Sequence, residues 1–316
     1  MRKLLITRPL PDAIVTAARA RFDVTLRDNT APLAAQELRA ALRDFDAVLP
    51  TLGDLFRADV FADVPQPRVR ILANFGVGFN HIDAIAARAA GIAVTNTPGA
   101  VTDATADIAM ALLLMTARRA GEGERLVRAE KWTGWHPTQM LGTHVTGGRV
   151  GIIGMGRIGK AIARRCHFGF GMDVVFHNRS RVDDPGCPAQ QVPMAQALAA
   201  DFVMIAVPGS PATHHLINAQ RFAEMRPQGL LINISRGDVV DQAALITALQ
   251  TGQIAGAGLD VYEFEPQVPQ DLIAMENVTL LPHLGTAVPQ VRTAMGLMAV
   301  ANLVAHLDGL PLPNAV

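Results

Sequence analysis

A short run in the middle of the chain, RVGIIGMGRIGKAIARRC at residues 149–166, limits the possible folds more than any other part. An apolar segment leads into Gly154-x-Gly156-x-x-Gly159, and a helix-compatible segment follows. The first glycine permits a tight turn, the second lets the backbone approach a pyrophosphate, and the third lets helix and strand pack closely. The N-terminus of the helix offers amide donors to phosphates. The run therefore predicts a dinucleotide-binding unit with Gly154, Met155, Gly156, Arg157, Ile158 and Gly159 at the cofactor; a glycine-rich turn without a ligand is the alternative.

The second strand of such a unit normally ends near an Asp or Glu that accepts a hydrogen bond from the ribose 2′-hydroxyl. Here Asn178 stands 19 residues after Gly159, and Arg179, Ser180 and Arg181 follow it. A carboxylate would repel a 2′-phosphate, whereas two guanidinium groups and a hydroxyl can bind one. The cluster predicts that NADP(H) is preferred over NAD(H). A solvated basic loop with no such role is the alternative.

Short apolar strands alternate with amphipathic helices along the chain, which indicates parallel sheets of the α/β type. Strands are expected at 3–7, 22–26, 46–50, 70–74 and 92–96, with helices around 11–20, 34–43 and 81–90. One long helix is expected from about 101 to 130. A second set of strands starts at 150, and another long helix ends the chain.

This order predicts an α/β fold with two doubly wound parallel-sheet domains, in which a Rossmann cofactor domain is inserted into a flavodoxin-like substrate domain. The substrate domain would comprise residues 1–98 and 287–316, and the cofactor domain residues 99–286. A chain of 316 residues, half of them hydrophobic, is large enough for two cores. The active site is expected in the cleft between the domains.

Charge and cysteine content exclude several classes of protein. Lys plus Arg and Asp plus Glu each total 28, so no general attraction to nucleic acid or to an anionic membrane is expected. The two cysteines, Cys166 and Cys187, do not form a disulfide framework, and Cys166 is expected in the core. The longest apolar run, residues 108–117, is too short to span a membrane, and no signal peptide is visible. We expect a soluble, cytoplasmic protein with no metal site.

Three polar residues follow apolar strands in the second half of the chain. Arg236 comes after LLINIS, Glu265 after GAGLDVYEF and His283 after VTLLP. Ligands bind beyond the carboxyl ends of strands in open α/β sheets, so the three side chains are expected to converge. A His beside a carboxylate is suited to act as a general acid, and an Arg can clamp a keto acid's carboxylate. Each residue alone has an ordinary structural explanation; together they indicate a catalytic site.

A series of motifs along the chain resembles the D-2-hydroxyacid dehydrogenase family: NFGVGFNHID, NTPGAVTDATAD, GIIGMGRIGKAIARR, INISRGDVVDQAAL, GAGLDVYEFEP and LLPHLGTA. The match runs from about Asn74 to Ala287. Within the family the chain is most similar to the glyoxylate and hydroxypyruvate reductases, which tend to prefer NADPH. The resemblance implies reduction of small 2-oxo acids, such as glyoxylate and hydroxypyruvate, to 2-hydroxy acids.

The resemblance also assigns roles to individual residues. It implies that Arg236, Glu265 and His283 are catalytic, with His283 protonating the carbonyl oxygen while Glu265 holds its ring. Residues that would bind the substrate are Leu52, Gly53, Val77, Gly78, Arg236 and His283. Further residues that would line the cofactor are Thr105, Val207, Pro208, Thr213, Ile234, Asp260, His283 and Gly285.

Two apolar segments predict a homodimer formed mainly by the cofactor domains. An apolar, Met-rich helix at 107–117 and the tryptophan-bearing loop Trp132–Gly142 exceed the needs of one small core; a buried interdomain helix is the alternative. Gln139 and Met140 of this loop would reach the partner's substrate.

Other activities of the family fit the chain less well. Formate dehydrogenases have Gln where Glu265 stands, and phosphoglycerate dehydrogenases usually keep the acidic ribose ligand. Phosphite and aryl keto acid dehydrogenases are excluded only weakly. A dinucleotide-sensing, corepressor-like binding protein is the alternative from a different class.

Overall fold

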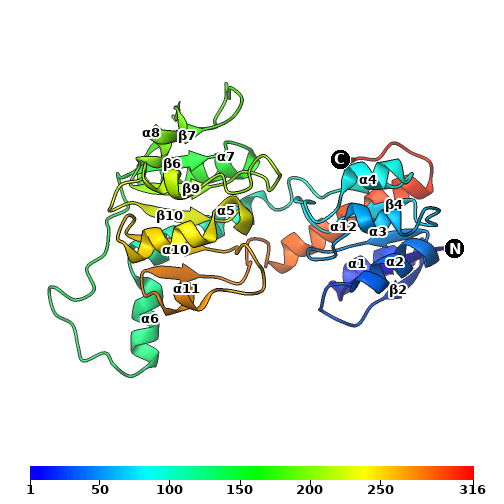
Figure 1. The fold of residues 1–316 in the computed structure, drawn as a ribbon, viewed down its shortest axis with the longest axis horizontal. Coiled ribbons are helices and arrows are strands. Elements are labelled where there is room, and N and C mark those ends of the chain that lie inside the picture. The colour runs from blue at the N-terminus through cyan, green and yellow to red at the C-terminus, as the bar shows by residue number, and fades with distance from the viewer. The chain divides into compact units, whose positions relative to one another are not determined.

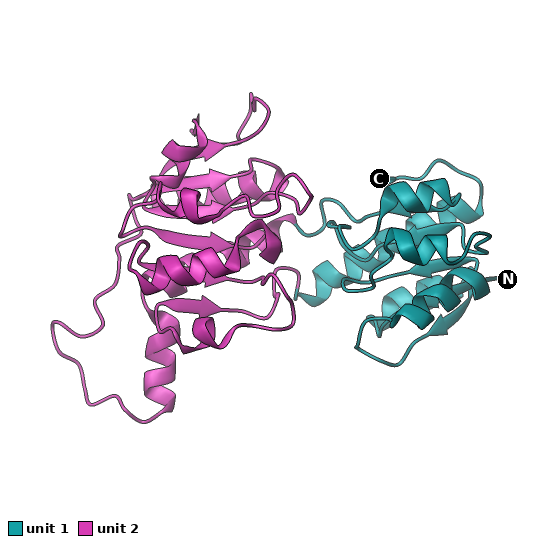
Figure 2. Cartoon of the chain, viewed as in Figure 1, with its two compact units in different colours: residues 1–101, 287–316 teal, residues 102–286 magenta.

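The computed structural model describes residues 1–316 and divides into two compact units. Unit 1 comprises residues 1–101 and 287–316, and unit 2 comprises residues 102–286 (Figure 2). The sequence placed the first junction between 98 and 99, slightly before the observed change at 101/102, and the second between 286 and 287. Both ends of the chain therefore build unit 1, and unit 2 is inserted between them.

Unit 1 contains a five-stranded, all-parallel sheet of order β2-β1-β3-β4-β5. Its strands are β1 Arg2–Ile6, β2 Phe22–Leu26, β3 Ala47–Leu49, β4 Ile71–Ala73 and β5 Ala93–Thr95, and its helices are α1 Asp12–Arg19, α2 Ala35–Asp44, α3 Ala58–Ala62, α4 Ala84–Ala89 and α12 Pro289–Leu307. Alternate residues of β1 enter different clusters: Leu5 packs with α2, α3 and α4, whereas Leu4 and Ile6 pack with α1 and α12. Helices thus cover both faces of the sheet, as a doubly wound fold requires.

Unit 2 contains a seven-stranded, all-parallel sheet of order β12-β11-β10-β9-β6-β7-β8 (Figure 1). Its strands are β6 Arg149–Ile153, β7 Asp173–His177, β8 Gln190–Gln191, β9 Phe202–Ile205, β10 Leu230–Asn233, β11 Gly256–Leu259 and β12 Val278–Leu280. Its helices are α5 Thr102–Ala117, α6 Ala120–Arg128, α7 Arg157–Arg164, α8 Met194–Leu198, α9 Ala219–Phe222, α10 Gln242–Gln250 and α11 Gln270–Ala274. Residues of α5 and α7 join the cluster on one face, and residues of α8 and α10 join the other. The strand order reverses between β6 and β9, and such a point is where open α/β sheets bind ligands.

The prediction of a single helix from 101 to 130 is wrong. The structure has two helices, α5 and α6, which are separated at Arg118 and Arg119. Arg119 takes a left-handed conformation with φ of 53°, and its guanidinium pairs with Glu122. Two arginines are good helix formers, so no residue in the sequence signals the break. Most apolar residues of α5 are buried in the core of unit 2, whereas Ile108, Ala111, Leu114 and Met115 are only partly buried.

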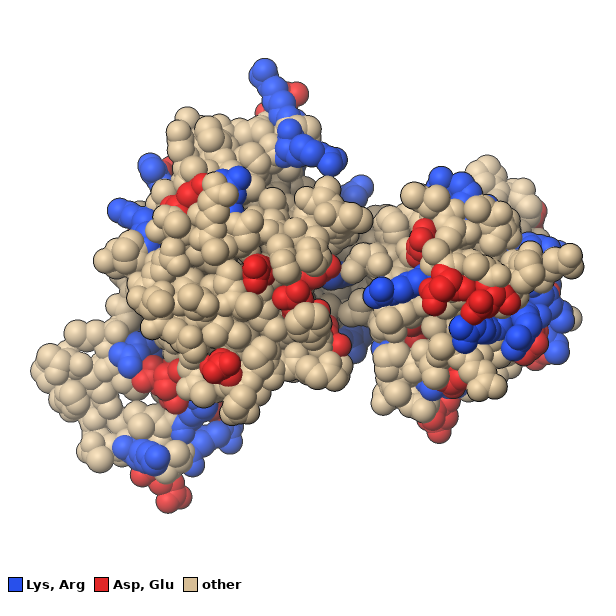
Figure 3. Space-filling view, in the orientation of Figure 1, with Lys and Arg blue, Asp and Glu red and all other residues tan.

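The distribution of charged residues on the surface and the burial of Cys166 match the expectations from the composition. Acidic and basic side chains are intermixed on the viewed face of each unit (Figure 3). No helix is long and apolar enough to cross a membrane. Cys166 is fully buried in the unit 2 core, and burial, together with the nearby Cys187, raises the pKa of its thiol to about 12.

Candidate active site

The glycine loop lies at the reversal point of the unit 2 sheet. Gly154 has φ of 101°, and a Cβ there would lie 2.7 Å from the carbonyl oxygen of Ala206, at the end of β9. A Cβ on Gly159 would lie 2.1 Å from the carbonyl oxygen of Gly154. Both residues must therefore be glycine for the protein to pack. A Cβ on Gly156 would meet nothing within 4 Å, so its absence leaves open space over the start of α7, where a pyrophosphate fits.

The loop after β7 is bound to the glycine loop through Asn178. Its Oδ1 accepts a hydrogen bond from the N–H of Met155 at 3.1 Å, and its Nδ2 donates to the carbonyl of Ser180 at 2.9 Å. Arg179 and Ser180 are exposed beside it. Arg181 forms an ion pair with Asp183 at 2.8 Å, a neighbour that the sequence interpretation did not consider. The four predicted residues lie together, but only one of the two guanidinium groups has an acidic partner.

Gln191 is a residue of this region that the sequence analysis missed. Its Nε2 donates to the carbonyls of Asn178 at 3.1 Å and Ser180 at 3.0 Å, and its Oε1 accepts from the N–H of Val182 at 3.0 Å. One side chain on β8 therefore holds the backbone of the whole loop 178–182. A glutamine in a two-residue edge strand carries no recognisable signal, because its partners depend on strand pairing.

The loop after β9 borders the glycine loop and carries Val207, Pro208 and Thr213. The hydroxyl of Thr213 donates to the carbonyl of Pro208 at 2.7 Å and accepts from the N–H of Ser210 at 2.9 Å. These bonds close the loop on itself. The methyl group of Val207 would lie 2.9 Å from a Cβ on Gly154, which places Val207 directly beside the glycine turn.

Glu265 and His283 form the central pair of the site. Oε2 of Glu265 lies 2.9 Å from Nδ1 of His283, and Oε1 accepts from the N–H of Tyr262 at 3.1 Å. Burial alone raises the pKa of Glu265, but the hydrogen bond and charge of His283, the Tyr262 amide and the charge of Arg236 outweigh it and lower the pKa below 4.5. The carboxylate is therefore ionised near neutral pH and fixes the ring through Nδ1.

Asp260 holds the segment that carries His283. Its carboxylate accepts from the N–H groups of Leu284 at 2.6 Å and Gly285 at 2.8 Å, and its carbonyl accepts from the N–H of His283 at 3.0 Å. Thr105 of α5 donates to the carbonyl of Gly285 at 3.2 Å. Burial raises the pKa of Asp260 more than these bonds lower it. The predicted residues Thr105, Asp260, His283 and Gly285 are thus directly connected.

Arg236 follows β10, beyond the buried Ile234, and approaches the same segment. A Cβ on Gly237 would lie 1.8 Å from the carbonyl carbon of Tyr262, so the Arg236–Gly237 peptide passes directly against the chain that leads to Glu265. Burial lowers the pKa of Arg236, while Glu265 and Asp238 raise it without fully compensating. The guanidinium lies within electrostatic range of the Glu265–His283 pair. The sequence analysis did not predict a role for Gly237, although this glycine directly follows Arg236. Its lack of a side chain is what allows the close approach to Tyr262.

Four predicted substrate residues lie in unit 1, beyond the ends of β3 and β4. The carbonyls of Gly76 and Gly78 accept from Nδ2 of Asn74, and that of Val77 accepts from Nδ2 of Asn96, at 2.8–3.0 Å. The N–H groups of Val77 and Gly78 make no hydrogen bond within the chain. After β3, Leu52 is half-buried and Gly53 has φ of 96°.

The tryptophan-bearing loop follows α6, a helix with no buried residue. Figure 1 shows α6 and this loop standing off from the rest of unit 2. Trp132, Trp135 and Leu141 are 54%, 79% and 67% exposed. Met140 reaches back to α6, where its methyl would lie 3.5 Å from a Cβ on Gly123, and Gln139 is half-buried.

Known proteins resemble this chain along its whole length. A model described as D-isomer specific 2-hydroxyacid dehydrogenase, NAD binding domain, matches residues 110–285. The glyoxylate reductase of Thermococcus onnurineus is 40% identical over 99% of this chain and 95% of its own length, and the glycerate dehydrogenase of Hyphomicrobium methylovorum is 35% identical over 94% of each. The crystal structure of an NADPH-dependent glyoxylate/hydroxypyruvate reductase from Sinorhizobium meliloti, in complex with NADP and malonate, superposes with a TM-score of 0.88 at 35% identity, covering 100% of this chain and 96% of that one.

Proposed function

The chain belongs to the D-isomer-specific 2-hydroxyacid dehydrogenase family of oxidoreductases, and on that premise we propose that it is an NADPH-preferring reductase of small 2-oxo acids such as glyoxylate and hydroxypyruvate. The proposal rests above all on one observation: His283 is held by Glu265 at 2.9 Å in the segment that Asp260 connects to Thr105 and Gly285. Relatives named as glyoxylate reductases and as a glycerate dehydrogenase support the substrate class.

His283 is the proton donor in this proposal. Because Nδ1 faces the ionised carboxylate of Glu265, Nδ1 keeps its proton and Nε2 is left to protonate the carbonyl oxygen of the substrate. A bound reduced nicotinamide supplies the hydride that the carbonyl carbon accepts. One hydride and one proton convert the 2-oxo acid to the 2-hydroxy acid. Glu265 stabilises the imidazolium before transfer and orients the ring.

Arg236 and two backbone amides are proposed to bind the substrate. The guanidinium of Arg236 can form paired hydrogen bonds to a carboxylate and polarise the adjacent carbonyl. The N–H groups of Val77 and Gly78 make no other hydrogen bond in the chain, so they are available to a carboxylate. We assign Leu52 and Gly53 to substrate binding as well.

The preference for NADPH rests on the cluster Asn178–Arg181. Asn178 replaces the expected carboxylate with an amide that is already engaged by Met155 and Ser180. No acid therefore faces the ribose at that position, and the guanidinium of Arg179 is free of any ion pair within the chain. A structural neighbour was crystallised with NADP, which supports the same choice.

Steady-state turnover tests the function. Loss of NADPH absorbance is followed with glyoxylate, hydroxypyruvate, pyruvate and an aryl keto acid. Oxidation of phosphite is followed with NADP⁺, as a gain of NADPH absorbance. Glyoxylate or hydroxypyruvate is expected to give the highest kcat/KM, and His283→Ala is expected to lower kcat by about 10²–10⁴.

Other outcomes of the same assay point elsewhere. Turnover of phosphite or of the aryl acid alone would assign a different dehydrogenase activity. Tight NADPH binding without turnover of any substrate would favour a dinucleotide-sensing protein. A preference for NADH, or near-native kcat in His283→Ala, would contradict the cofactor or the proton donor proposed here.

A further inference from the structure

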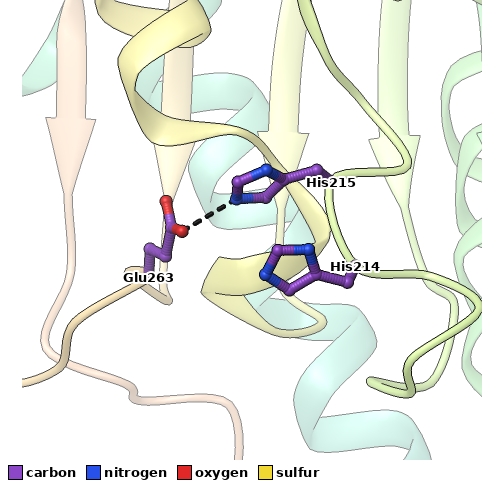
Figure 4. A group of neighbouring side chains, drawn as sticks. All are labelled: His214, His215 and Glu263. Carbon is purple, nitrogen blue, oxygen red and sulfur yellow. Dashed lines mark hydrogen bonds and ion pairs between the residues drawn. The ribbon is translucent and has the colours of Figure 1, made fainter.

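Two histidines and a glutamate form a second cluster in unit 2, outside the residues assigned to the reaction. His214 and His215 lie on the loop between β9 and α9, and Glu263 follows β11 (Figure 4). Nε2 of His215 lies 2.8 Å from Oε1 of Glu263, and the two imidazole centroids are 4.0 Å apart. One nitrogen of each ring and one carboxylate oxygen lie within 4.8 Å of one another.

The surrounding protein holds these groups in place. The side chain of Glu263 is only 12% exposed, and its Oε2 accepts from the N–H of Gln242 at 3.3 Å, which leaves Oε1 facing the imidazoles. Asp241 lies on the other side of His215, with Oδ2 4.0 Å from Nδ1. The N–H of His215 donates to the carbonyl of Asp238 at 2.8 Å while its backbone has φ of 48°. His215 and Glu263 are therefore fixed by the surrounding protein, whereas the exposed ring of His214 stacks on that of His215 with 24° between the two planes.

We propose that His214, His215 and Glu263 bind a divalent cation of the zinc class. Two imidazoles and one carboxylate are a donor set that zinc uses in proteins, with water in a fourth position. Asp241 lies on the side of His215 where a ligating histidine usually has an outer carboxylate partner, with Oδ2 at 4.0 Å from Nδ1, beyond hydrogen-bonding distance. No Lys or Arg pairs with Glu263 or Asp241, so the negative charge of the cluster is not otherwise neutralised.

The bound cation would join two segments of the candidate active site. His214 directly follows Thr213 of the loop beside the glycine turn, and Glu263 stands two residues before Glu265. Cation binding is therefore expected to stabilise unit 2 against heat. This inference does not rest on the proposed reaction, because binding is measured without turnover.

Cobalt(II) is the probe, since its visible absorbance reports coordination. The full-length protein, freed of metal by chelation and dialysis, is titrated with Co²⁺ and then with Zn²⁺. We expect one Co²⁺ per chain with the intense bands of a four- or five-coordinate ion, displaced by Zn²⁺. His214→Ala and Glu263→Gln are each expected to weaken binding more than tenfold, and Asp241→Asn, which retains a helix-capping side chain, about 10–100-fold.

Two further variants locate the site. His144→Ala removes an exposed histidine elsewhere in unit 2, and His283→Ala removes the histidine of the reaction site; both are expected to keep the cobalt bands. The proposal is overturned if wild type gives only the weak spectrum of hydrated cobalt, or if His214→Ala and Glu263→Gln bind as tightly as wild type. It is equally overturned if the bands disappear in His283→Ala, because the ion would then occupy the reaction site.

Discussion

The contact between Glu265 and His283 determines how the activity depends on pH. His283 contributes to lowering the pKa of Glu265 below that of a free glutamate, so the carboxylate is ionised near neutral pH. That carboxylate lies 2.9 Å from Nδ1 of His283, where it accepts the hydrogen bond of the ring. In the proposed mechanism His283 must be protonated for reduction, so the rate is expected to fall as pH rises.

Glu265→Gln is therefore expected to move the basic limb of the kcat/KM profile for 2-oxo acid reduction to lower pH. At pH 8 the loss is expected to be roughly tenfold or greater, which is part of the usual contribution of a general acid. Profiles of wild type and variant, measured with saturating NADPH, check this. A limb that stays in place while the rate falls would mean that Glu265 acts on something other than His283.

Arg179 and Arg181 are not equivalent, although the sequence presents them as a pair. Arg181 pairs with Asp183 at 2.8 Å, whereas Arg179 makes no ion pair within the chain. Arg179→Ala is expected to lower kcat/KM for NADPH by about tenfold or more, because a charge-assisted phosphate contact contributes about 1.5–3 kcal/mol. NADH use is expected to be nearly unchanged. Arg181→Ala serves as the matched comparison; an equal or larger loss in that variant would reverse the assignment.

At the scale of elements, the short strand β8 positions the loop 178–182, to which we assign the 2′-phosphate of the cofactor. Gln191 makes three hydrogen bonds to the backbone of residues 178–182, each with a net contribution of about 0.5–1.5 kcal/mol. Gln191→Ala is expected to raise KM for NADPH several-fold while kcat and the KM for NADH change little. Gln190→Ala, at the adjacent exposed position, is the control. If the two variants behave alike, Gln191 does not position the loop.

Two glycines at the turn between β6 and α7 are expected to serve different purposes. Gly159 is required for packing of the protein, whereas Gly156 is expected to be required for cofactor binding. Gly159→Ala places a methyl 2.1 Å from a carbonyl oxygen, so a loss of about 1–3 kcal/mol of stability is expected. Gly156→Ala meets no protein atom within 4 Å, so its stability is expected to stay close to that of wild type while NADPH affinity falls. Thermal unfolding and NADPH titration of both variants distinguish the two effects. Native NADPH affinity in Gly156→Ala would show that the pyrophosphate lies elsewhere.

At the scale of the whole molecule, α6 and the tryptophan-bearing loop form the surface where we expect a partner to bind. Helix α6 buries none of its residues, and Trp132, Trp135 and Leu141 are all more than half exposed. Exposed apolar groups of this kind mark protein interfaces, and a second copy of the chain with two-fold symmetry is the simplest partner. The partly exposed apolar residues Ile108, Leu114 and Met115 of α5 support the same dimer prediction.

Light scattering at micromolar concentration is expected to give twice the 33.6 kDa mass of one chain. Trp135→Glu is expected to shift the mass toward that of one chain, because it would place a charge in an apolar interface. Leu310→Glu changes an apolar residue of unit 1 that is 60% exposed, and it is expected to leave the mass unchanged. If the wild-type protein has the mass of one chain under these conditions, the prediction of a homodimer is wrong.

The sequence by itself determined the α/β class, the alternation of strands and helices along the chain, the glycine turn and the positions of Arg236, Glu265 and His283 after apolar strands. These features are local: periodic burial, the steric need for glycine and the end of an apolar run are visible within a few residues. Boundaries were close because turns and caps are local as well.

Tertiary structure decided which distant residues meet. The break at Arg119, the ion pair of Arg181, the loop contacts of Gln191 and the approach of His215 to Glu263, 48 positions away in the chain, follow from strand order and helix packing. Side chains such as Gln and His have many possible partners, and no local pattern selects among them. The order of neighbouring strands in the sheet makes that selection, because it places the loops after β9 and β11 side by side across the end of β10.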